Sequence, residues 1–313
     1  MNIRIATIIT CFNRKEKTVS CLSHLFEALS IYNSQHPQTI INLSIYLTDD
    51  GCTDGTADAV KAVCKDKDLH IIQGDGNCYW AGGMRLAWNE ALKDKDIWDF
   101  YLLLNDDTIV LDNVFNELFL THKYALDNYQ KAGLYSGITC DINNPESITY
   151  GGEKLQGKLN GDGVKVTQTN LPQLVDQTNA NILLVTKDVV NELGIFYKGF
   201  KHGGADYDYS MQAHKHGFPT LVTAKVCGKC EYDHISGQDE IKKLMSMTWK
   251  ERRQYQENPI HSDKDYLLYI KRNLPHKYAV CKILREIRIL CPYLYGKICK
   301  IRGLHEYKRK QKS

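Results

Sequence analysis

Hydrophobic and polar residues follow two patterns in the first part of the chain. Short runs that are apolar throughout, or that alternate every second residue, predict strands. Between them, apolar residues recur at three- and four-residue intervals, which is typical of helices that cover a core. The predicted strands are residues 3–10, 41–47, 69–73 and 100–104, and the predicted helices are 16–30, 57–65, 80–92 and 114–129. This alternation indicates an α/β fold with a doubly wound, mostly parallel sheet.

The middle of the chain has a less regular pattern. Residues 133–139 and 147–163 are rich in glycine and strand-like, which predicts a smaller mixed sheet region. Further elements follow it: strands at 180–185 and 221–227, and helices at 187–193 and 206–216. Gly217 stands where a helix commonly ends.

From about residue 240 the chain mixes apolar and basic residues. No run reaches the roughly 18–20 uncharged residues that span a bilayer. An apolar stripe at helical intervals comprises Leu284, Ile287, Leu290, Leu294 and Ile298, beside Lys282, Arg285, Arg288 and Lys297. Pro292 is expected to interrupt or kink this helix. The pattern predicts a basic amphipathic helix at a surface.

Charge is unevenly distributed along the 313 residues. Residues 1–240 carry a net charge of −10 and residues 241–313 one of +13, which together give the overall +3. A basic C-terminal region points to an anionic partner, either a membrane surface or a nucleic acid. The 11 cysteines are scattered and the sequence opens on a predicted strand, so we expect no secretory leader and reduced thiols in the cytoplasm.

Acidic residues gather where predicted strands end. Tyr101 to Leu104 reads as a buried strand, and it runs directly into Asn105, Asp106 and Asp107. Buried carboxylates need a cationic partner, and a hard divalent metal such as Mg²⁺ or Mn²⁺ is the simplest candidate. A turn is the alternative explanation, because Asn and Asp favour turns.

Two other strand ends meet the same edge of a parallel sheet. Asn13 and Arg14 follow the first strand, and Asp49 and Asp50 follow the second. Ligands of such sheets bind beyond the carboxyl ends of the strands. Thr53 or Asp54 can cap the next helix, so capping does not require Asp49 and Asp50. The two acids are therefore candidates for contacts with a nucleotide.

A third acidic group opens the predicted helix at 206–216. One Asp would suffice to favour the helix dipole, yet Asp206 and Asp208 are both present. A carboxylate at a helix start beside a cleft can serve as a general base toward a hydroxyl. His234, after the last predicted strand, is a candidate third metal ligand, although a lone histidine is more often structural.

Four motifs in this order resemble the family 2 inverting glycosyltransferases over roughly residues 3–235. They are TCFNR at 10–14, DDGCTDGT at 49–56, NDD at 105–107 and DYDYS at 206–210. Among family members, the chain is most similar to bacterial enzymes of capsule, O-antigen and other cell-surface polysaccharide assembly, including rhamnosyltransferase-like proteins. The resemblance implies a GT-A fold, a nucleoside-diphosphate sugar donor and a divalent metal.

The resemblance also implies roles for individual residues. Asp107 matches the acid that holds metal and diphosphate, and Asp106 matches the middle position of the same motif. Asp206 matches the catalytic base, with Asp208 as second choice. The remaining donor-binding candidates are Thr10, Asn13, Arg14, Asp49, Asp50, Asn77 and Gly82. His234 joins Asp107 as a metal candidate.

The chain departs from the family pattern at three positions. Asn105 stands at the first acidic position and cannot ligate as a carboxylate. Ala205 stands where a Glu usually precedes the base. Arg85 stands where Asn is frequent in the glycine-rich segment 77–85, so donor specificity cannot be carried over.

These observations predict a GT-A domain over 1–239, with a nucleotide-sugar half (1–130) and an acceptor half (131–239). Residues 240–313 form a basic, amphipathic helical region. The predicted activity is metal-dependent (Mn²⁺ or Mg²⁺) hexosyl or deoxyhexosyl transfer to a glycan or lipid-linked glycan in bacterial surface-polysaccharide synthesis. We expect a cytoplasmic protein that binds no nucleic acid and that lies peripherally on the inner face of the plasma membrane, with a homodimer as the alternative use of the basic region.

Two other classes of function compete. A nucleotidyltransferase acting on sugar phosphates would share the sheet and the metal acids, but residues 10–14 lack a glycine-rich basic phosphate loop. A non-catalytic protein that binds nucleic acid or membrane would explain the basic C-terminal region. The acidic body and the absence of a recognition module argue against nucleic acid.

Overall fold

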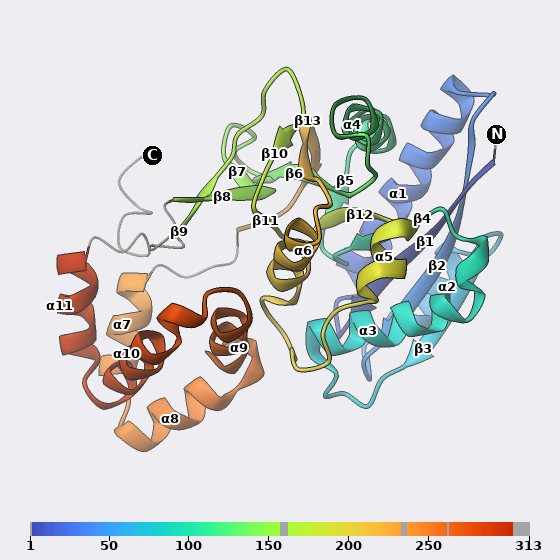
Figure 1. Cartoon of the computed structure of the whole chain (residues 1–313). Coiled ribbons are helices and arrows are strands. Elements are labelled where there is room, and N and C mark those ends of the chain that lie inside the picture. The colour runs from blue at the N-terminus through green and yellow to red at the C-terminus, as the bar shows by residue number, and fades with distance from the viewer. Residues whose placement is uncertain (1, 157–161, 233–236, 262, 303–313) are drawn as a thin grey trace.

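The structure, a computed structural model, describes residues 2–156, 162–232, 237–261 and 263–302 (Figure 1). It confirms the predicted α/β fold, in which helices flank a central sheet and further helices follow at the C-terminal end.

The N-terminal half alternates strand and helix as predicted. Its elements are β1 (Asn2–Cys11), α1 (Lys15–Gln35), β2 (Ile40–Asp49), α2 (Thr56–Val63), β3 (Asp68–Gln73), α3 (Tyr79–Ala91), η1 (Leu92–Ile97), β4 (Phe100–Leu104), β5 (Ile109–Val110) and α4 (Val114–Tyr129). β3, β2, β1 and β4 are neighbours in that order, and each pair is parallel. Their carboxyl ends therefore share one edge of the sheet.

The second half extends the same sheet. Its elements are β6 (Leu134–Cys140), β7 (Ile148–Tyr150), β8 (Gly152–Gln156), β9 (Asp162–Lys165), β10 (Gln173–Leu174), β11 (Gln177–Thr178), β12 (Ile182–Thr186), α5 (Lys187–Leu193), α6 (Ala205–Lys215) and β13 (Thr220–Lys229). The strand order is β10-β13-β6-β12-β4-β1-β2-β3, and β11-β8-β9 form a separate small sheet. β12 runs antiparallel between β4 and β6. The region predicted as a small mixed sheet is thus divided: β6 joins the main sheet and β8 does not.

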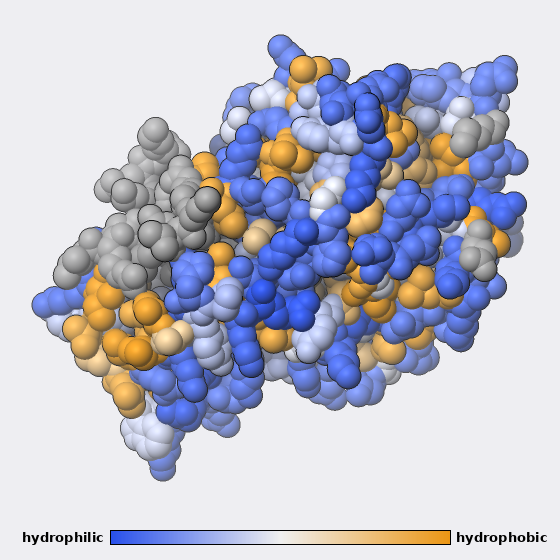
Figure 2. Space-filling model, viewed as in Figure 1, coloured by the Kyte–Doolittle hydropathy of each residue, from blue (hydrophilic) through white to orange (hydrophobic). Residues whose placement is uncertain are grey.

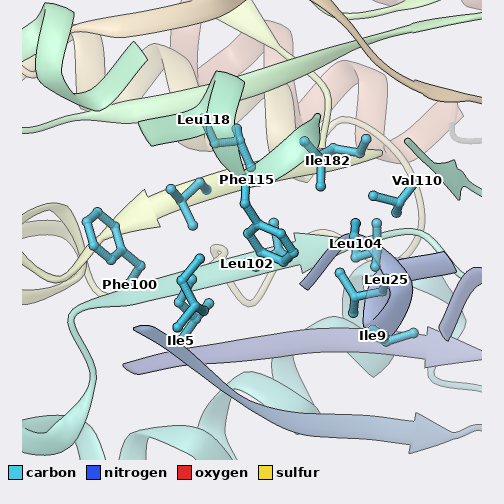
Figure 3. Packing of buried hydrophobic residues seen from close by; sticks show 14 of the residues in the cluster. Ile5, Ile9, Leu25, Phe100, Leu102, Leu104, Val110, Phe115, Leu118 and Ile182 are labelled. Carbon is cyan, nitrogen blue, oxygen red and sulfur yellow. The ribbon is translucent and has the colours of Figure 1, made fainter. Parts of the chain in front are cut away.

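β4 is buried on both faces, as its apolar run predicts. Leu102 and Leu104 pack into a cluster with residues of α1 and α4, and Figure 3 shows Phe115 of α4 against Leu102. Tyr101 and Leu103 face the opposite cluster, which includes residues of α3 and α6. Fully burying one such side chain contributes about 1.5–3 kcal/mol, so this strand anchors the edge on which it ends.

Five helices and two short 3₁₀ turns follow β13 in the part of the chain that is described. They are α7 (Gly237–Met245), α8 (Trp249–Glu257), η2 (Pro259–His261), α9 (Asp263–Asn273), η3 (Pro275–Lys277), α10 (Tyr278–Leu290) and α11 (Pro292–Arg302). The break before Pro292 confirms the predicted interruption. Tyr269, Ile270 and Leu274 belong to the same core cluster as α3 and α6. This region therefore packs on the sheet domain rather than standing apart from it.

Two basic residues of the predicted surface stripe face inward. Arg285 and Arg288 are 13% and 16% exposed, and both pair with Asp263 of α9. Arg285 also pairs with Glu257. The amphipathic pattern predicts a helix at α10 but not these ion pairs, because the pattern does not show which basic side chains lie near acidic residues of other helices.

Candidate active site

The predicted convergence of strand ends is present. Cys11 at the end of β1 pairs with Asp49 at the end of β2, and β4 lies on the other side of β1. Asn13, Asp50 and the triplet 105–107 therefore follow neighbouring parallel strands. Parallel pairing makes this juxtaposition a direct consequence of the strand order.

Arg14 joins the two acids of the triplet. Its Nη1 lies 2.7 Å from Asp107 Oδ2 and 3.2 Å from Asp106 Oδ1. Thr18 Oγ1 donates a hydrogen bond to Asp106 Oδ2 at 3.2 Å. Burial raises the pKa of Asp106 to about 6, and the charge of Arg14 opposes that rise. A guanidinium thus supplies the cationic partner that the sequence led us to expect from a metal.

Asn105 is a structural member of the triplet. Its Oδ1 accepts a hydrogen bond from Trp80 Nε1 at 2.8 Å, and its backbone N–H donates to Asn181 O at 3.1 Å. The first contact reaches α3 and the second reaches the residue before β12. Asn105 therefore fixes the end of β4 to two neighbours.

Asp50 is engaged by backbone donors. Its Oδ1 accepts from the N–H groups of Gly76 at 2.9 Å and Cys78 at 3.2 Å, and its Oδ2 accepts from Tyr79 at 3.1 Å. Asp49 Oδ1 accepts from the Cys52 N–H at 2.7 Å. Both acids are 4% exposed. Asp50 holds the segment that opens α3, a role that the sequence did not indicate.

The loop after β1 is tied to the loop after β2. Asn13 has a positive φ of 50°, and its Oδ1 accepts from the Thr53 N–H at 2.7 Å. The Asn13 N–H lies 3.2 Å from Cys52 Sγ. These bonds place two of the predicted donor-binding loops side by side.

The glycine-rich segment packs closely on β1. Thr10 leaves no room for a Cβ on Gly83, and Thr48 Oγ1 donates to the Gly83 carbonyl at 2.8 Å. Asn77 is exposed, with its N–H donating to Asp75 Oδ1 at 2.8 Å. The Gly82 N–H faces the Lys201 carbonyl at 3.4 Å. Thr10 and Gly82 thus shape the site through packing and backbone contacts.

Asp206 opens α6, as predicted. Its Oδ2 accepts from the Ala180 N–H at 3.1 Å, and its Oδ1 accepts from its neighbour Tyr207 at 2.9 Å. Burial raises the pKa of Asp206 to about 6, the two backbone donors oppose that rise, and the charge of Glu153 adds to it. A carboxylate with a pKa near neutrality is well matched to general-base chemistry.

Asp208 has a different environment. It is 2% exposed, and its Oδ1 accepts from Arg272 Nε at 2.8 Å and Asn273 Nδ2 at 2.7 Å. Both partners belong to α9. Asp208 is therefore an internal tie between α6 and α9, and it is not brought to the site as the second-choice base.

Strand β12 brings the base candidate to the acid triplet. Asp206 bonds the Ala180 N–H, and the next residue, Asn181, accepts from the Asn105 N–H. Because β12 is antiparallel to β4, its start lies at the carboxyl end of β4, with Ile182 opposite Leu104. The two acidic centres thus share one sheet edge.

Two groups of residues could hold a cation. Asp106 and Asp107 offer hard carboxylate oxygens, and Arg14, whose side chain is 46% exposed, has solvent into which it can withdraw. Among the described residues, Asp50, Asp75 and Cys78 also bring ligand atoms within 4.8 Å of one another. Burial raises the pKa of the Cys78 thiol to about 11, and Asp50 already accepts three N–H groups, so the first group fits a hard cation better. His234 lies outside the described residues.

The sequence did not reveal the contribution of residues 201–203. The Lys201 carbonyl accepts from the Ala81 N–H at 3.1 Å, at the start of α3. The ring of His202 lies edge-on to Tyr79, with 6.3 Å between ring centroids, and burial lowers the pKa of His202. Basic residues in a glycine-containing loop just before an acidic helix start are the signal that could have drawn attention to this loop.

The first part of the chain is similar to a known protein family. Residues 6–129 match the family model described as glycosyl transferase family 2. This part of the chain is similar to the glycosyl transferase family 2 domain. It contains β1 through α4 and the acid triplet, whereas Asp206 lies beyond the matched residues.

The solved structures that resemble the chain include S. aureus TarS. The crystal structure of TarS residues 1–349 has a TM-score of 0.52 at 13% identity, covering 97% of this chain and 80% of that one. The same fragment in complex with UDP-GlcNAc has a TM-score of 0.49 at 12% identity, covering 98% and 79%. The TarS 1–349 structure and the family match agree in giving the chain the GT-A fold. No curated protein matches the sequence.

Proposed function

We propose that the chain is a metal-dependent, inverting hexosyl- or deoxyhexosyltransferase that uses a nucleoside-diphosphate sugar. One observation carries this proposal: an acid pair, Asp106 buried and Asp107 partly exposed, and a separate carboxylate with a raised pKa meet at one sheet edge of a domain similar to glycosyl transferase family 2. The pair suits the charged leaving group, and Asp206 suits the acceptor hydroxyl.

The acid pair lies on the leaving-group side. Asp107, together with Asp106, would hold the divalent cation in place of the Arg14 guanidinium. When bound, such a cation stabilises the negative charge that develops on the departing diphosphate. Arg14, released from the carboxylates, can then donate to the same phosphate oxygens.

Asp206 lies on the acceptor side. Its carboxylate takes the proton of the acceptor hydroxyl as the hydroxyl oxygen attacks the anomeric carbon from the face opposite the diphosphate. The bond to the diphosphate breaks as the new glycosidic bond forms, so the anomeric configuration inverts. The backbone N–H groups that hold Asp206 fix the direction of its oxygens.

The donor nucleotide would lie along the loops after β1 and β2. Asp49 and the Asn13 loop face this edge, while Asp50 and Thr10 support the segment that carries Asn77 and Gly82. The base and the ribose of a nucleotide carry N–H and O–H groups that can donate hydrogen bonds to carboxylates. We propose that these loops select the nucleotide.

We further propose a glycan or lipid-linked glycan of a bacterial surface polysaccharide as acceptor, reached at a membrane surface from the cytoplasmic side. Val280 and Ile283 on α10, and Leu290 and Leu294 beyond them, are exposed beside Lys282, Lys297 and Lys300. Figure 2 shows apolar side chains gathered over this end of the molecule. Within the described ranges, no helix is long and apolar enough to cross a bilayer. Exposed apolar residues flanked by lysine suit an anionic lipid surface.

A flotation assay tests the membrane proposal. The full chain should float with vesicles that contain anionic lipid and remain below with neutral vesicles. Ile283→Asp should abolish flotation, whereas Leu120→Asp, at an exposed position of α4, should not. A stable homodimer that buries α10, with no flotation, would contradict the membrane assignment.

A thermal-shift screen followed by a transfer assay tests the main proposal. UDP-, GDP- and dTDP-sugars with Mn²⁺ should include one that raises the melting temperature, because a ligand of the native state stabilises it. That donor should be consumed when glycan acceptors are added. Asp107→Asn should weaken both effects. Stabilisation by nucleoside triphosphate together with pyrophosphate release would instead indicate a nucleotidyltransferase.

A further inference from the structure

One carboxylate from the C-terminal helices holds the loop that leads into α6. Asp265, in the first turn of α9, is 4% exposed. Its Oδ2 accepts from the backbone N–H groups of His202 at 2.6 Å and Gly203 at 3.1 Å. The Lys201 N–H lies 3.1 Å from Oδ1 and 3.2 Å from Oδ2. One buried side chain therefore satisfies three consecutive backbone donors.

The same loop touches both sides of the active site. The Lys201 carbonyl accepts from the N–H groups of Ala81 at 3.1 Å and Gly82 at 3.4 Å, in the first turn of α3. Five residues further along the chain is Asp206. Between them Gly204 has a φ of 77°, which allows the sharp entry into α6. The Lys201 peptide thus connects Asp265 on one side with the glycine-rich segment on the other.

We propose that Asp265 is a positioning residue for glycosyl transfer. By holding residues 201–203 it sets the spacing between the donor-side segment at the start of α3 and the base Asp206. The helices after residue 237 are then part of the catalytic unit. This inference rests on the proposed function, because it assigns Asp265 an effect on that reaction.

We expect the loss of the Asp265 carboxylate to disturb residues 201–203 and to leave α9 in place. Removing the carboxylate leaves three partly buried backbone N–H groups without their acceptor, which the loop can correct only by moving toward water. α9 itself has other attachments, through Ile270 in the core and through Arg272 and Asn273 to Asp208. The helix can stay in place while the loop is released. A displaced base slows the chemical step far more than donor binding.

Asp263 provides a matched control on the same helix. It is 6% exposed, two residues from Asp265, and it pairs with Arg285 and Arg288, both within the C-terminal helices. Asp265→Asn and Asp263→Asn are compared in the full chain. The measurements are melting temperature, hydrogen exchange of the amides of residues 201–203, and kcat and donor KM per folded enzyme.

Asp265→Asn should speed exchange of those three amides at least tenfold, lower kcat at least tenfold and change donor KM less than threefold. Asp263→Asn should lower the melting temperature but leave the exchange of residues 201–203 and kcat near wild type. Wild-type exchange and kcat in Asp265→Asn would overturn the proposal, as would equal kcat losses in both variants. A wild-type chain that transfers no sugar would refute the proposed function, while the exchange result would still test the contact itself.

Discussion

Asp206 and Asp208 are two residues apart on one helix, and their surroundings give them different roles. Asp208 accepts from the cationic Arg272, which makes it an internal ion-pair partner. Among the described residues, Asp206 accepts from backbone donors and is repelled by Glu153, and burial raises its pKa to about 6. The sequence presents both as helix-start acids, and it does not reveal the partner on α9.

The pKa of Asp206 predicts the pH dependence of the reaction. A raised pKa means that the carboxyl keeps its proton up to about pH 6, and a protonated carboxyl cannot accept one from the acceptor. We expect kcat to fall about tenfold per unit as the pH drops below about 6. The measurement is kcat against pH at saturating donor and acceptor. A kcat that stays flat from pH 7 to pH 5 would count against Asp206 as the base.

Arg14 and a divalent cation compete for the same carboxylate oxygens. Arg14→Ala should therefore tighten Mn²⁺ binding in the absence of donor, by about three- to tenfold for a partly exposed ion pair. Titration calorimetry measures this affinity. Lys17→Ala is the control: it removes another ion pair of α1, the one with Glu231, and should leave the Mn²⁺ affinity unchanged. Equal or weaker Mn²⁺ binding in Arg14→Ala would show that the two cations do not share a site.

The hydrophobic pattern of the sequence predicts helices and strands wherever neighbouring residues alone determine the structure. The apolar run of β4 predicts its burial on both faces, and the strand alternation predicts that Asp49 and Asp106 share an edge. The pattern could not predict that β12 lies antiparallel beside β4, because hydrophobicity does not specify a partner strand. That pairing is what brings Asp206 to the acids. The sequence thus predicts where the strands end, but not which distant segments pair with them.

Two adjacent glycines of α3, Gly82 and Gly83, should differ in how well each tolerates alanine, because only one of them packs closely on β1. A Cβ on Gly83 would overlap Thr10, including its Cβ at 2.8 Å, whereas one on Gly82 would be 3.5 Å from Cys78 Cβ. Gly83→Ala should lower the free energy of unfolding by about 1–3 kcal/mol through overpacking. Gly82→Ala should leave it unchanged or raise it by up to about 1 kcal/mol, because alanine favours helix. Urea unfolding of both variants measures the difference, and equal stabilities would refute the close packing.

The C-terminal helices share a hydrophobic core with the sheet domain. Ile270 is 3% exposed in the cluster that includes α3 and α6 residues. Ile270→Ala should lower the free energy of unfolding by about 2–5 kcal/mol, and unfolding should remain a single transition. Val280→Ala, at a site 44% exposed, should change it by less than about 0.5 kcal/mol. Calorimetry that resolves two transitions in the wild type would show that the regions fold independently.

The stereochemistry of the product distinguishes inverting transfer, with Asp206 as the base, from the alternatives. With a donor from the screen, NMR of the product should show the anomeric configuration opposite to that of the donor. Asp206→Asn should lower kcat by about 10²–10⁴-fold, the usual contribution of a general base, and still bind the donor. Asp208→Asn should mainly lower stability. Retained configuration would rule out inverting transfer, and a fully active Asp206→Asn enzyme would rule out Asp206 as the base.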